Sequence, residues 1–229
     1  MAFDFKAHGK QFETILGEGH EYYVKVKVNL LRKMMLEEKL NLPMRALDVG
    51  CGTGIAEEFF GAGTDGFVGI DTAESMLRIA KERRTHAEYL CADGSEMPFV
   101  GGTFDLVFSF ALMHHLEPSE RLGALGEIAR VTKRGGYVFT FEHNPTNPLV
   151  RRIVRQCIVD QGVQLIRSVD MVRLHSKAGL RVVDVKYLAF FPRLLSFFEP
   201  IDSALHPVPL GGQYVVAARK PGPIEDPRV

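Results

Sequence analysis

The chain has 229 residues, of which 46% are hydrophobic and 24% are charged. This composition can fill a core, so it excludes disordered and fibrous proteins, and the length suits one domain of generous size. The 28 basic residues balance the 28 acidic ones, so the net charge gives no attraction to nucleic acid or to an anionic membrane. We therefore expect a folded protein whose partner is not a nucleic acid.

The spacing of the cysteines and the length of the apolar runs indicate the cellular compartment. Cys51, Cys91 and Cys157 are odd in number and widely spaced, which fits neither a disulfide framework nor a zinc site. The first ten residues lack the apolar segment of a secretory signal, and no stretch approaches the roughly 18 apolar residues of a membrane span. We expect a cytoplasmic protein without a membrane span.

A helix is the first element that the sequence predicts. Residues 21–40 settle into a helical apolar stripe that includes Leu30, Met34 and Met35. From residue 44 to residue 143, short apolar runs alternate with longer helical patterns, as in a parallel sheet built from strand–helix–strand units. The strand runs are apolar at consecutive positions, which indicates that helices cover both faces of the sheet.

Three further segments complete the expected fold. Residues 148–160 carry a helical apolar stripe, and residues 180–191 and 212–220 form two strands that no helix joins and that we expect to be antiparallel. The sequence thus predicts the α/β class, with a doubly wound, mostly parallel, seven-stranded sheet and an antiparallel last strand. We expect a single domain, divided into an N-terminal helical cap (1–43), a core (44–143) and a terminal part (144–220).

A glycine-rich turn follows the first predicted strand. In LDVGCGTG, residues 47–54, Asp48 ends a buried strand, and Gly50, Gly52 and Gly54 lie in the turn that opens the next helix. Glycine allows positive φ and close backbone approach, and ligands of open α/β sheets bind at the carboxyl ends of the strands. Ile55 stands where a dinucleotide fingerprint needs its third glycine, and no lysine of a phosphate-binding loop follows. The pattern therefore indicates a nucleotide-like ligand that is not held through a pyrophosphate.

The pattern D-x-G-x-G-x-G after a strand resembles the first motif of the class I S-adenosylmethionine-dependent methyltransferases, in their small-molecule subgroup. The resemblance continues through FDLVFSFALMHHL (104–116) and EIARVTKRGGYVFTFEH (127–143), and it covers roughly residues 44–143. It implies a Rossmann-like methyltransferase fold and S-adenosyl-L-methionine as the cofactor. It also implies that Asp71 binds the ribose hydroxyls and that Asp93 binds the adenine amino group. The residues expected at the cofactor are Asp48, Gly50, Gly52, Gly54, Asp71, Thr72, Met76, Ala92, Asp93, Gly94 and Phe110.

The ends of the fourth and fifth strands supply the candidates for catalysis. The sulfonium already carries an activated methyl group, so the protein needs to exclude water, align the acceptor and remove a proton from it, and no metal is required. We expect His114, His115, Glu142 and His143 to surround the methyl group, because these strand ends meet beside it. Packing is the alternative role for the two adjacent histidines, and capping of backbone amides is the alternative for the three aspartates.

The acceptor pocket is expected from the segments outside the core. The resemblance implies that the N-terminal helix and residues 144–200 close over the cofactor, with Tyr22, Tyr23, Lys27 and Asn144 at the acceptor and with the phenylalanines 190, 191, 197 and 198 as a lid, a dimer contact or core. A small metabolite methylated on oxygen or nitrogen is the favoured acceptor, and glycan or secondary-metabolite biosynthesis is the setting that similar sequences suggest. The alternatives are a non-catalytic cofactor-binding partner or regulatory subunit and an enzyme of the same fold with other chemistry. The chain is expected to be a monomer or a homodimer.

Overall fold

The computed structural model describes residues 9–40, 44–60, 66–83, 85–191 and 204–222. The strands are β1 (Ala46–Val49), β2 (Phe67–Asp71), β3 (Ala87–Cys91), β4 (Phe104–Phe110), β5 (Thr132–His143), β6 (Arg181–Leu188) and β7 (Gln213–Arg219). The helices are α1 (Gly9–Glu37), α2 (Ile55–Phe60), α3 (Glu74–Glu82), α4 (Arg121–Val131), α5 (Pro148–Gln156) and α6 (Ser168–Lys177), and a short 3-10 helix covers Met113–His115.

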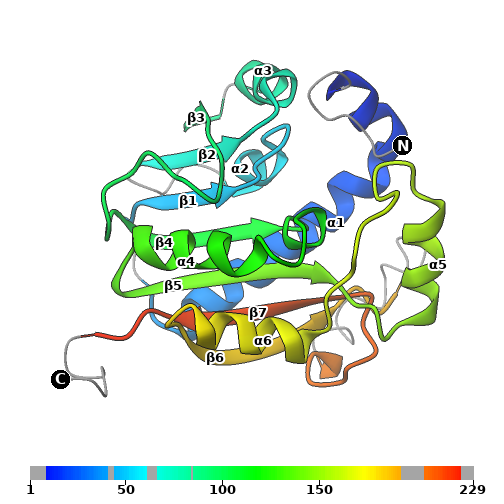
Figure 1. Ribbon diagram of the computed structural model, residues 1–229. Coiled ribbons are helices and arrows are strands. Elements are labelled where there is room, and N and C mark those ends of the chain that lie inside the picture. Colours follow the sequence, from blue (N-terminus) through cyan, green and yellow to red (C-terminus); the bar gives the residue numbers. More distant parts are fainter. Residues whose placement is uncertain (1–8, 41–43, 61–65, 84, 192–203, 223–229) are drawn as a thin grey trace.

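One seven-stranded sheet organises the described part of the chain, in the order β3-β2-β1-β4-β5-β7-β6 (Figure 1). The strands from β3 to β5 pair in parallel, whereas β7 is antiparallel to both of its neighbours, β5 and β6. The predicted α/β sheet with an antiparallel last strand is therefore confirmed. The strand order reverses between β1 and β4, and such a switch point leaves a crevice at the carboxyl ends of the strands.

Apolar layers cover both faces of the sheet. On one face, α1 and α2 bury residues such as Leu31, Met34 and Phe60 against β4 and β5. On the other face, α4 and α6 bury Leu125 and Met171, and both helices lie in front of the sheet in Figure 1. In the same view the parallel strands point toward the side on which α5 lies. The edge at which α5 lies is therefore the one that holds the carboxyl ends of the parallel strands.

The structure differs from the sequence prediction at two helices. The N-terminal helix starts by Gly9 instead of residue 21, because nothing between these positions stops a helix and single glycines such as Gly19 cost only about 1 kcal/mol there. Helix α6 was not predicted at all. Two of its three buried side chains, Ser168 and His175, are polar, so its buried face carries no continuous apolar stripe. Among the described residues, no helix has both the length and the apolar character needed to cross a membrane.

Candidate functional site

A cavity of about 760 Å³ opens at the carboxyl ends of β1, β2 and β4. This volume lies within the range of roughly 300 to 1,000 Å³ that is usual for small-molecule sites. One end of the cavity is built from the turn after β1 and the ends of β2 and β3. The other end lies between α1, α5 and the ends of β4 and β5.

The glycine-rich turn shapes the first end of the cavity. Gly50, Gly52 and Gly54 have φ values of +79°, +55° and +74°, in the left-handed region that other residues avoid. A Cβ on Gly54 would lie 2.6 Å from the hydroxyl of Tyr89, so this glycine lets α2 approach the sheet. A Cβ on Gly52 would meet nothing within 4 Å, because this residue faces the open cavity.

Asp71 links the turn to the end of β2. Its Oδ2 accepts a hydrogen bond from the amide of Gly52 at 3.0 Å, and its Oδ1 accepts one from the amide of Ala73 at 2.8 Å. Burial raises the pKa of Asp71, and the two amide hydrogen bonds act against that shift. Each carboxylate oxygen keeps a second lone pair, so capping the turn and binding a ligand are compatible roles for Asp71.

Two other aspartates of the cavity wall differ in the hydrogen bonds that their carboxylate oxygens accept. Asp93 is exposed, and its Oδ1 accepts hydrogen bonds from the amide and the hydroxyl of Ser95, both at 2.7 Å. Asp48 is buried, and its Oδ1 finds no hydrogen-bond partner within the described residues. Burial first, and then the nearby carboxyls of Glu57 and Asp71, raise the pKa of Asp48 well above its usual range. A buried oxygen without a partner is costly, and here it belongs to a residue of the cavity wall, where a cationic or donor group of a ligand can satisfy it.

Most of the residues expected at the cofactor line the cavity. Gly54 is the exception, since it packs against Tyr89 and Ala80 instead. The ten expected residues that line the cavity are Asp48, Gly50, Gly52, Asp71, Thr72, Met76, Ala92, Asp93, Gly94 and Phe110.

A buried ion pair underlies the opposite end of the cavity. Glu142, near the end of β5, accepts a hydrogen bond from the amide of Met113 at 2.6 Å through Oε1, and its Oε2 lies 2.6 Å from Nδ1 of His114. Both side chains are fully buried. Burial opposes a charge on His114, but the carboxylates of Glu142 and Asp160 outweigh it and raise the pKa of this histidine to about 9. His114 is therefore protonated at neutral pH, and its charge in turn lowers the pKa of Glu142 against the effect of burial.

The other two histidines of this cluster are neutral at pH 7. Burial, together with the positive charge of His114, lowers the pKa of His115 to about 4 and that of His143 to about 3. The rings of His115 and His143 have their centroids 4.2 Å and 5.1 Å from that of His114. These three histidines thus bring one cationic imidazole and two neutral ones to the cavity wall.

Helix α1 contributes a buried cation to the same region. The ammonium of Lys27 lies 5.2 Å from the centre of the Phe110 ring and is 4% exposed. Burial lowers the pKa of Lys27 to about 8, while Glu142 and Asp48 favour its charged form. Lys27 and Tyr23, both predicted at the acceptor, line the cavity.

Three predicted residues point elsewhere. Among the described residues that line the cavity, Glu142, Asn144 and Tyr22 are missing. Glu142 lies behind His114, and successive side chains of a strand alternate between faces, so Glu142 and His143 cannot both face the cavity. The amide nitrogen of Asn144 donates to the carbonyls of Pro209 and Gly211 at 3.2 and 2.8 Å, so in this structure Asn144 is turned away from the cavity and its contact with the acceptor stays a prediction.

The segment 144–200 covers the cavity only in part. Helix α5 contributes Leu149, Val150, Ile153 and Val154 to the wall, and Phe190 lies there too. Helix α6 packs on the sheet beside α4, so the expectation that the whole segment closes over the cofactor is wrong for residues 168–177. Phe197 and Phe198 lie outside the described residues.

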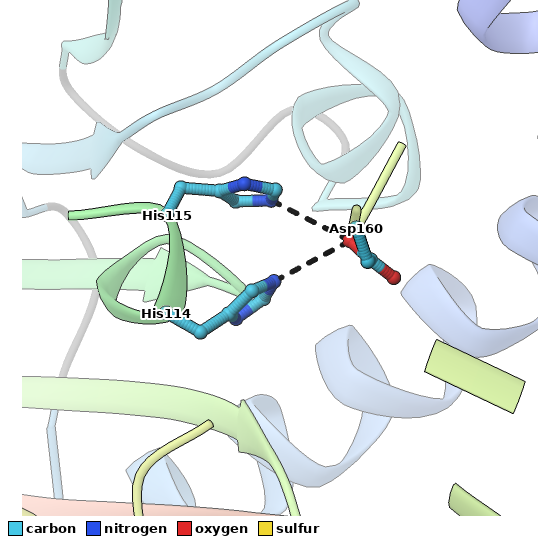
Figure 2. A group of neighbouring side chains, drawn as sticks. All are labelled: His114, His115 and Asp160. Atoms are coloured by element: carbon cyan, nitrogen blue, oxygen red, sulfur yellow. Dashed lines mark ion pairs between the residues drawn. The ribbon is translucent and has the colours of Figure 1, made fainter. Parts of the chain in front are cut away.

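Sequence reasoning missed several polar residues of the wall, among them His20, Asp160 and Gln213. His20 lies three and seven positions before Tyr23 and Lys27, so helical periodicity could have found it. Asp160 follows the end of α5, and its Oδ1 lies 3.6 Å from Nε2 of His114 and 3.7 Å from Nε2 of His115 (Figure 2). No local pattern marks Asp160 or Gln213, because folding brings both from distant parts of the chain.

Comparisons with known proteins agree with this geometry. Residues 47–140 match a family model described as a methyltransferase domain. The chain is 39% identical over 108 residues to a demethylmenaquinone methyltransferase of Renibacterium salmoninarum, an alignment that covers 45% of this chain and 44% of that protein. It is 24% identical over 179 residues to a ubiquinone biosynthesis O-methyltransferase of Coxiella burnetii, with 72% of this chain and 76% of that protein covered. The chain spans about half the length of the demethylmenaquinone methyltransferases that it matches, from 44% to 53%.

The fold is also that of solved methyltransferase structures. A methyltransferase from Archaeoglobus fulgidus superposes with a TM-score of 0.69 over 91% of this chain and 97% of that one, at 18% identity. At this level of identity the likeness concerns the fold alone.

Proposed function

We propose that this chain is a class I S-adenosylmethionine-dependent methyltransferase and that it transfers a methyl group from S-adenosyl-L-methionine to an oxygen or nitrogen atom of a small metabolite. The observation that carries the proposal is the single cavity that joins the turn after β1 to a wall of histidines and apolar side chains. Such a cavity lets two ligands lie next to each other in a fixed orientation, as a methyl transfer requires.

The end of the cavity near β1 and β2 suits the cofactor. Gly52 leaves room for a ligand against the backbone, and Asp71 and Asp93 offer acceptors for hydroxyl and amino groups. The unpartnered oxygen of Asp48 fits the cationic amino-acid end of S-adenosyl-L-methionine. This cofactor supplies a methyl group that a sulfonium already activates.

The other end suits an acceptor with an apolar body and one reactive polar group. Val150, Ile153, Val154 and Phe190 give an apolar wall, and Lys27 adds a buried cation. This wall favours an aromatic or aliphatic acceptor over a sugar, so it speaks against the suggested setting in glycan biosynthesis. Relatives named for demethylmenaquinone and for ubiquinone biosynthesis support a small organic acceptor.

His143 is our preferred group for receiving the acceptor's proton. Its imidazole lines the cavity and is neutral at pH 7, so a ring nitrogen can accept a hydrogen bond from a hydroxyl or an amine. His114 already carries a proton, and Glu142 is shielded behind it. As the bond from carbon to the acceptor atom forms and the bond from carbon to sulfur breaks, the acceptor's proton moves along this hydrogen bond to His143. Because the low pKa of this imidazole makes it a weak base, the proton then passes on to water.

The test separates binding from transfer. Calorimetry should detect S-adenosylhomocysteine with micromolar affinity, or about −8 kcal/mol, and no competition by NAD. Labelled cofactor offered with a panel of phenols, quinols and amines should then yield a methylated product that His143→Gln forms at least about 100-fold more slowly. His86→Gln is the matched control, because His86 is exposed before β3. Cofactor binding without transfer to any acceptor would favour the alternative of a non-catalytic partner, and the absence of binding would overturn the proposal.

A further inference from the structure

We propose that His114, His115 and Asp160 form a site for a divalent transition-metal ion of the zinc type, at the acceptor end of the cavity. The three side chains come from two segments, the short helix Met113–His115 after β4 and the turn after α5. One ligand atom from each residue lies within 4.8 Å of the others, and Figure 2 shows both imidazoles directed at the same carboxylate. Binding of the metal does not depend on the proposed methyl transfer.

Distances favour a small ion in tetrahedral surroundings. Asp160 Oδ1 lies 3.6 Å from Nε2 of His114 and 3.7 Å from Nε2 of His115. Zinc ligands about 2.0 to 2.1 Å from the ion in a tetrahedral site are about 3.3 Å apart, so Asp160 needs to approach each imidazole by only a few tenths of an ångström. The ligand atoms of the two histidines lie within 4.8 Å of each other and would close on the ion together. An octahedral magnesium site would bring its ligands closer together, and it would use oxygen atoms in place of imidazole.

The surroundings of His114 provide an independent observation. Its Nε2 is buried and faces Asp160 at 3.6 Å without a hydrogen bond within the described residues, while Glu142 holds Nδ1 at 2.6 Å. A metal ion would take the place of the proton on Nε2, which leaves to solvent. A carboxylate behind a ligating imidazole fixes its tautomer and directs the other nitrogen at the metal. Glu142 is therefore a positioning residue. Together, Glu142 and Asp160 carry the two negative charges that balance a divalent ion.

The ion would keep an open position toward the cavity. Zinc sites with three protein ligands bind a further molecule at the fourth position, and all three ligands line the cavity wall. That position would take an oxygen of the acceptor, a role that does rest on the proposed function. A metal there would orient a phenolate-like oxygen next to His143, whose ring centre is 5.1 Å from that of His114.

The experiment counts metal in the full chain. Protein stripped with a chelator and equilibrated with Zn²⁺ or Mg²⁺ should retain one Zn²⁺ per chain and no Mg²⁺ by elemental mass spectrometry. His115→Ala and Asp160→Asn should each weaken Zn²⁺ binding by more than about 100-fold, and Glu142→Gln by about 10- to 100-fold. The matched controls His86→Ala and Asp170→Asn, at exposed or partly exposed positions elsewhere, should bind as the parent does. Co²⁺ in the site should show the strong visible absorption of tetrahedral coordination.

Three outcomes would overturn the metal site: no retained Zn²⁺ in the parent chain, equal retention in His115→Ala or Asp160→Asn, or octahedral Co²⁺ spectra. Thermal unfolding of each variant identifies any that fail to fold. If the variants do not fold, the Co²⁺ spectrum of the parent decides whether the metal site exists. S-adenosylhomocysteine binding is measured in the same samples. Binding of S-adenosylhomocysteine without Zn²⁺ would overturn the metal site and leave the proposed function standing. Binding of Zn²⁺ without S-adenosylhomocysteine would overturn the proposed function and leave the metal site standing.

Discussion

Glu142 and His114 form an ion pair with no solvent exposure on either side chain, at 2.6 Å between Oε2 and Nδ1. The other oxygen of Glu142 accepts a hydrogen bond from the amide of Met113. One carboxylate therefore fixes the position of the short helix Met113–His115 and the orientation of the His114 ring. Strand β5 therefore sets the geometry of the cavity wall through a residue that does not itself reach the cavity.

Removing one partner of this pair should destabilise the fold. We expect Glu142→Ala to lower the free energy of unfolding by about 3 to 5 kcal/mol, because it leaves His114 as a buried charge without its partner. Glu142→Gln should cost less, since its amide oxygen can still accept from Nδ1. Urea unfolding measures both, with Glu96→Ala as an exposed control. A loss below about 1 kcal/mol for Glu142→Ala would contradict the prediction.

His175 should make stability depend on pH in the acid range. It is fully buried between Thr140 Oγ1, at 3.1 Å, and the carbonyl of Met171, at 2.9 Å, and burial lowers its pKa to about 4. Its neutral form is favoured in the folded state, so the stability that it contributes is present above its unfolded pKa of about 6.5 and falls as the pH drops toward 4. Between about pH 7.5 and about pH 5, this residue alone should cost about 2 kcal/mol.

The measurement compares the chain with His175→Gln, whose side chain can keep a hydrogen bond to Thr140 but does not titrate. Urea unfolding at several pH values should show the parent losing more stability than the variant below pH 6.5. The other buried histidines are common to both proteins, so the difference between the curves isolates His175. Parallel curves would show that His175 gains no proton on unfolding.

Asp71→Asn should weaken binding of S-adenosylhomocysteine about 10- to 100-fold, because hydrogen bonds to a charged acceptor are the stronger class. Asparagine keeps an oxygen for one of the two amides, that of Gly52 or that of Ala73, and loses the other hydrogen bond, whereas alanine would lose both. Calorimetry gives the dissociation constant and thermal unfolding checks the fold. An unchanged constant in a folded variant would leave capping as the role of Asp71.

The core of the fold and the turn after β1 could be predicted because their signals are local. Consecutive apolar residues, the spacing of glycines and the aspartates at or just after the ends of β1, β2 and β3 are all recognised within a few positions of the chain. Side-chain direction could not be read in the same way. Glu142 and His143 were both expected at the methyl group although neighbours on a strand face opposite ways, and Tyr22 lies off the helical face that Tyr23 shares with Lys27.

Contacts between distant segments could not be predicted from the sequence. Asp160 meets the two histidines only because the chain turns back after α5, and Asn144 is held by carbonyls of Pro209 and Gly211. Helix α6 was not predicted because two of its three buried side chains are polar, so its buried face has no apolar stripe in the sequence; the sheet face that it covers provides the stabilising contacts.

Two glycines of the turn should respond differently to the same change. Gly54→Ala places a methyl group 2.6 Å from the Tyr89 hydroxyl and 2.9 Å from Cβ of Ala80, at a φ of +74°, so we expect a loss of stability above about 2 kcal/mol. Gly52→Ala meets no neighbour within 4 Å and bears only the cost of its positive φ, about 1 to 2 kcal/mol. Its methyl group points into the cavity, so Gly52→Ala should fold yet bind S-adenosylhomocysteine at least about tenfold more weakly. Thermal unfolding and calorimetry on both variants test this contrast. Equal stabilities with equal affinities would mean that the turn neither packs against Tyr89 nor faces the ligand.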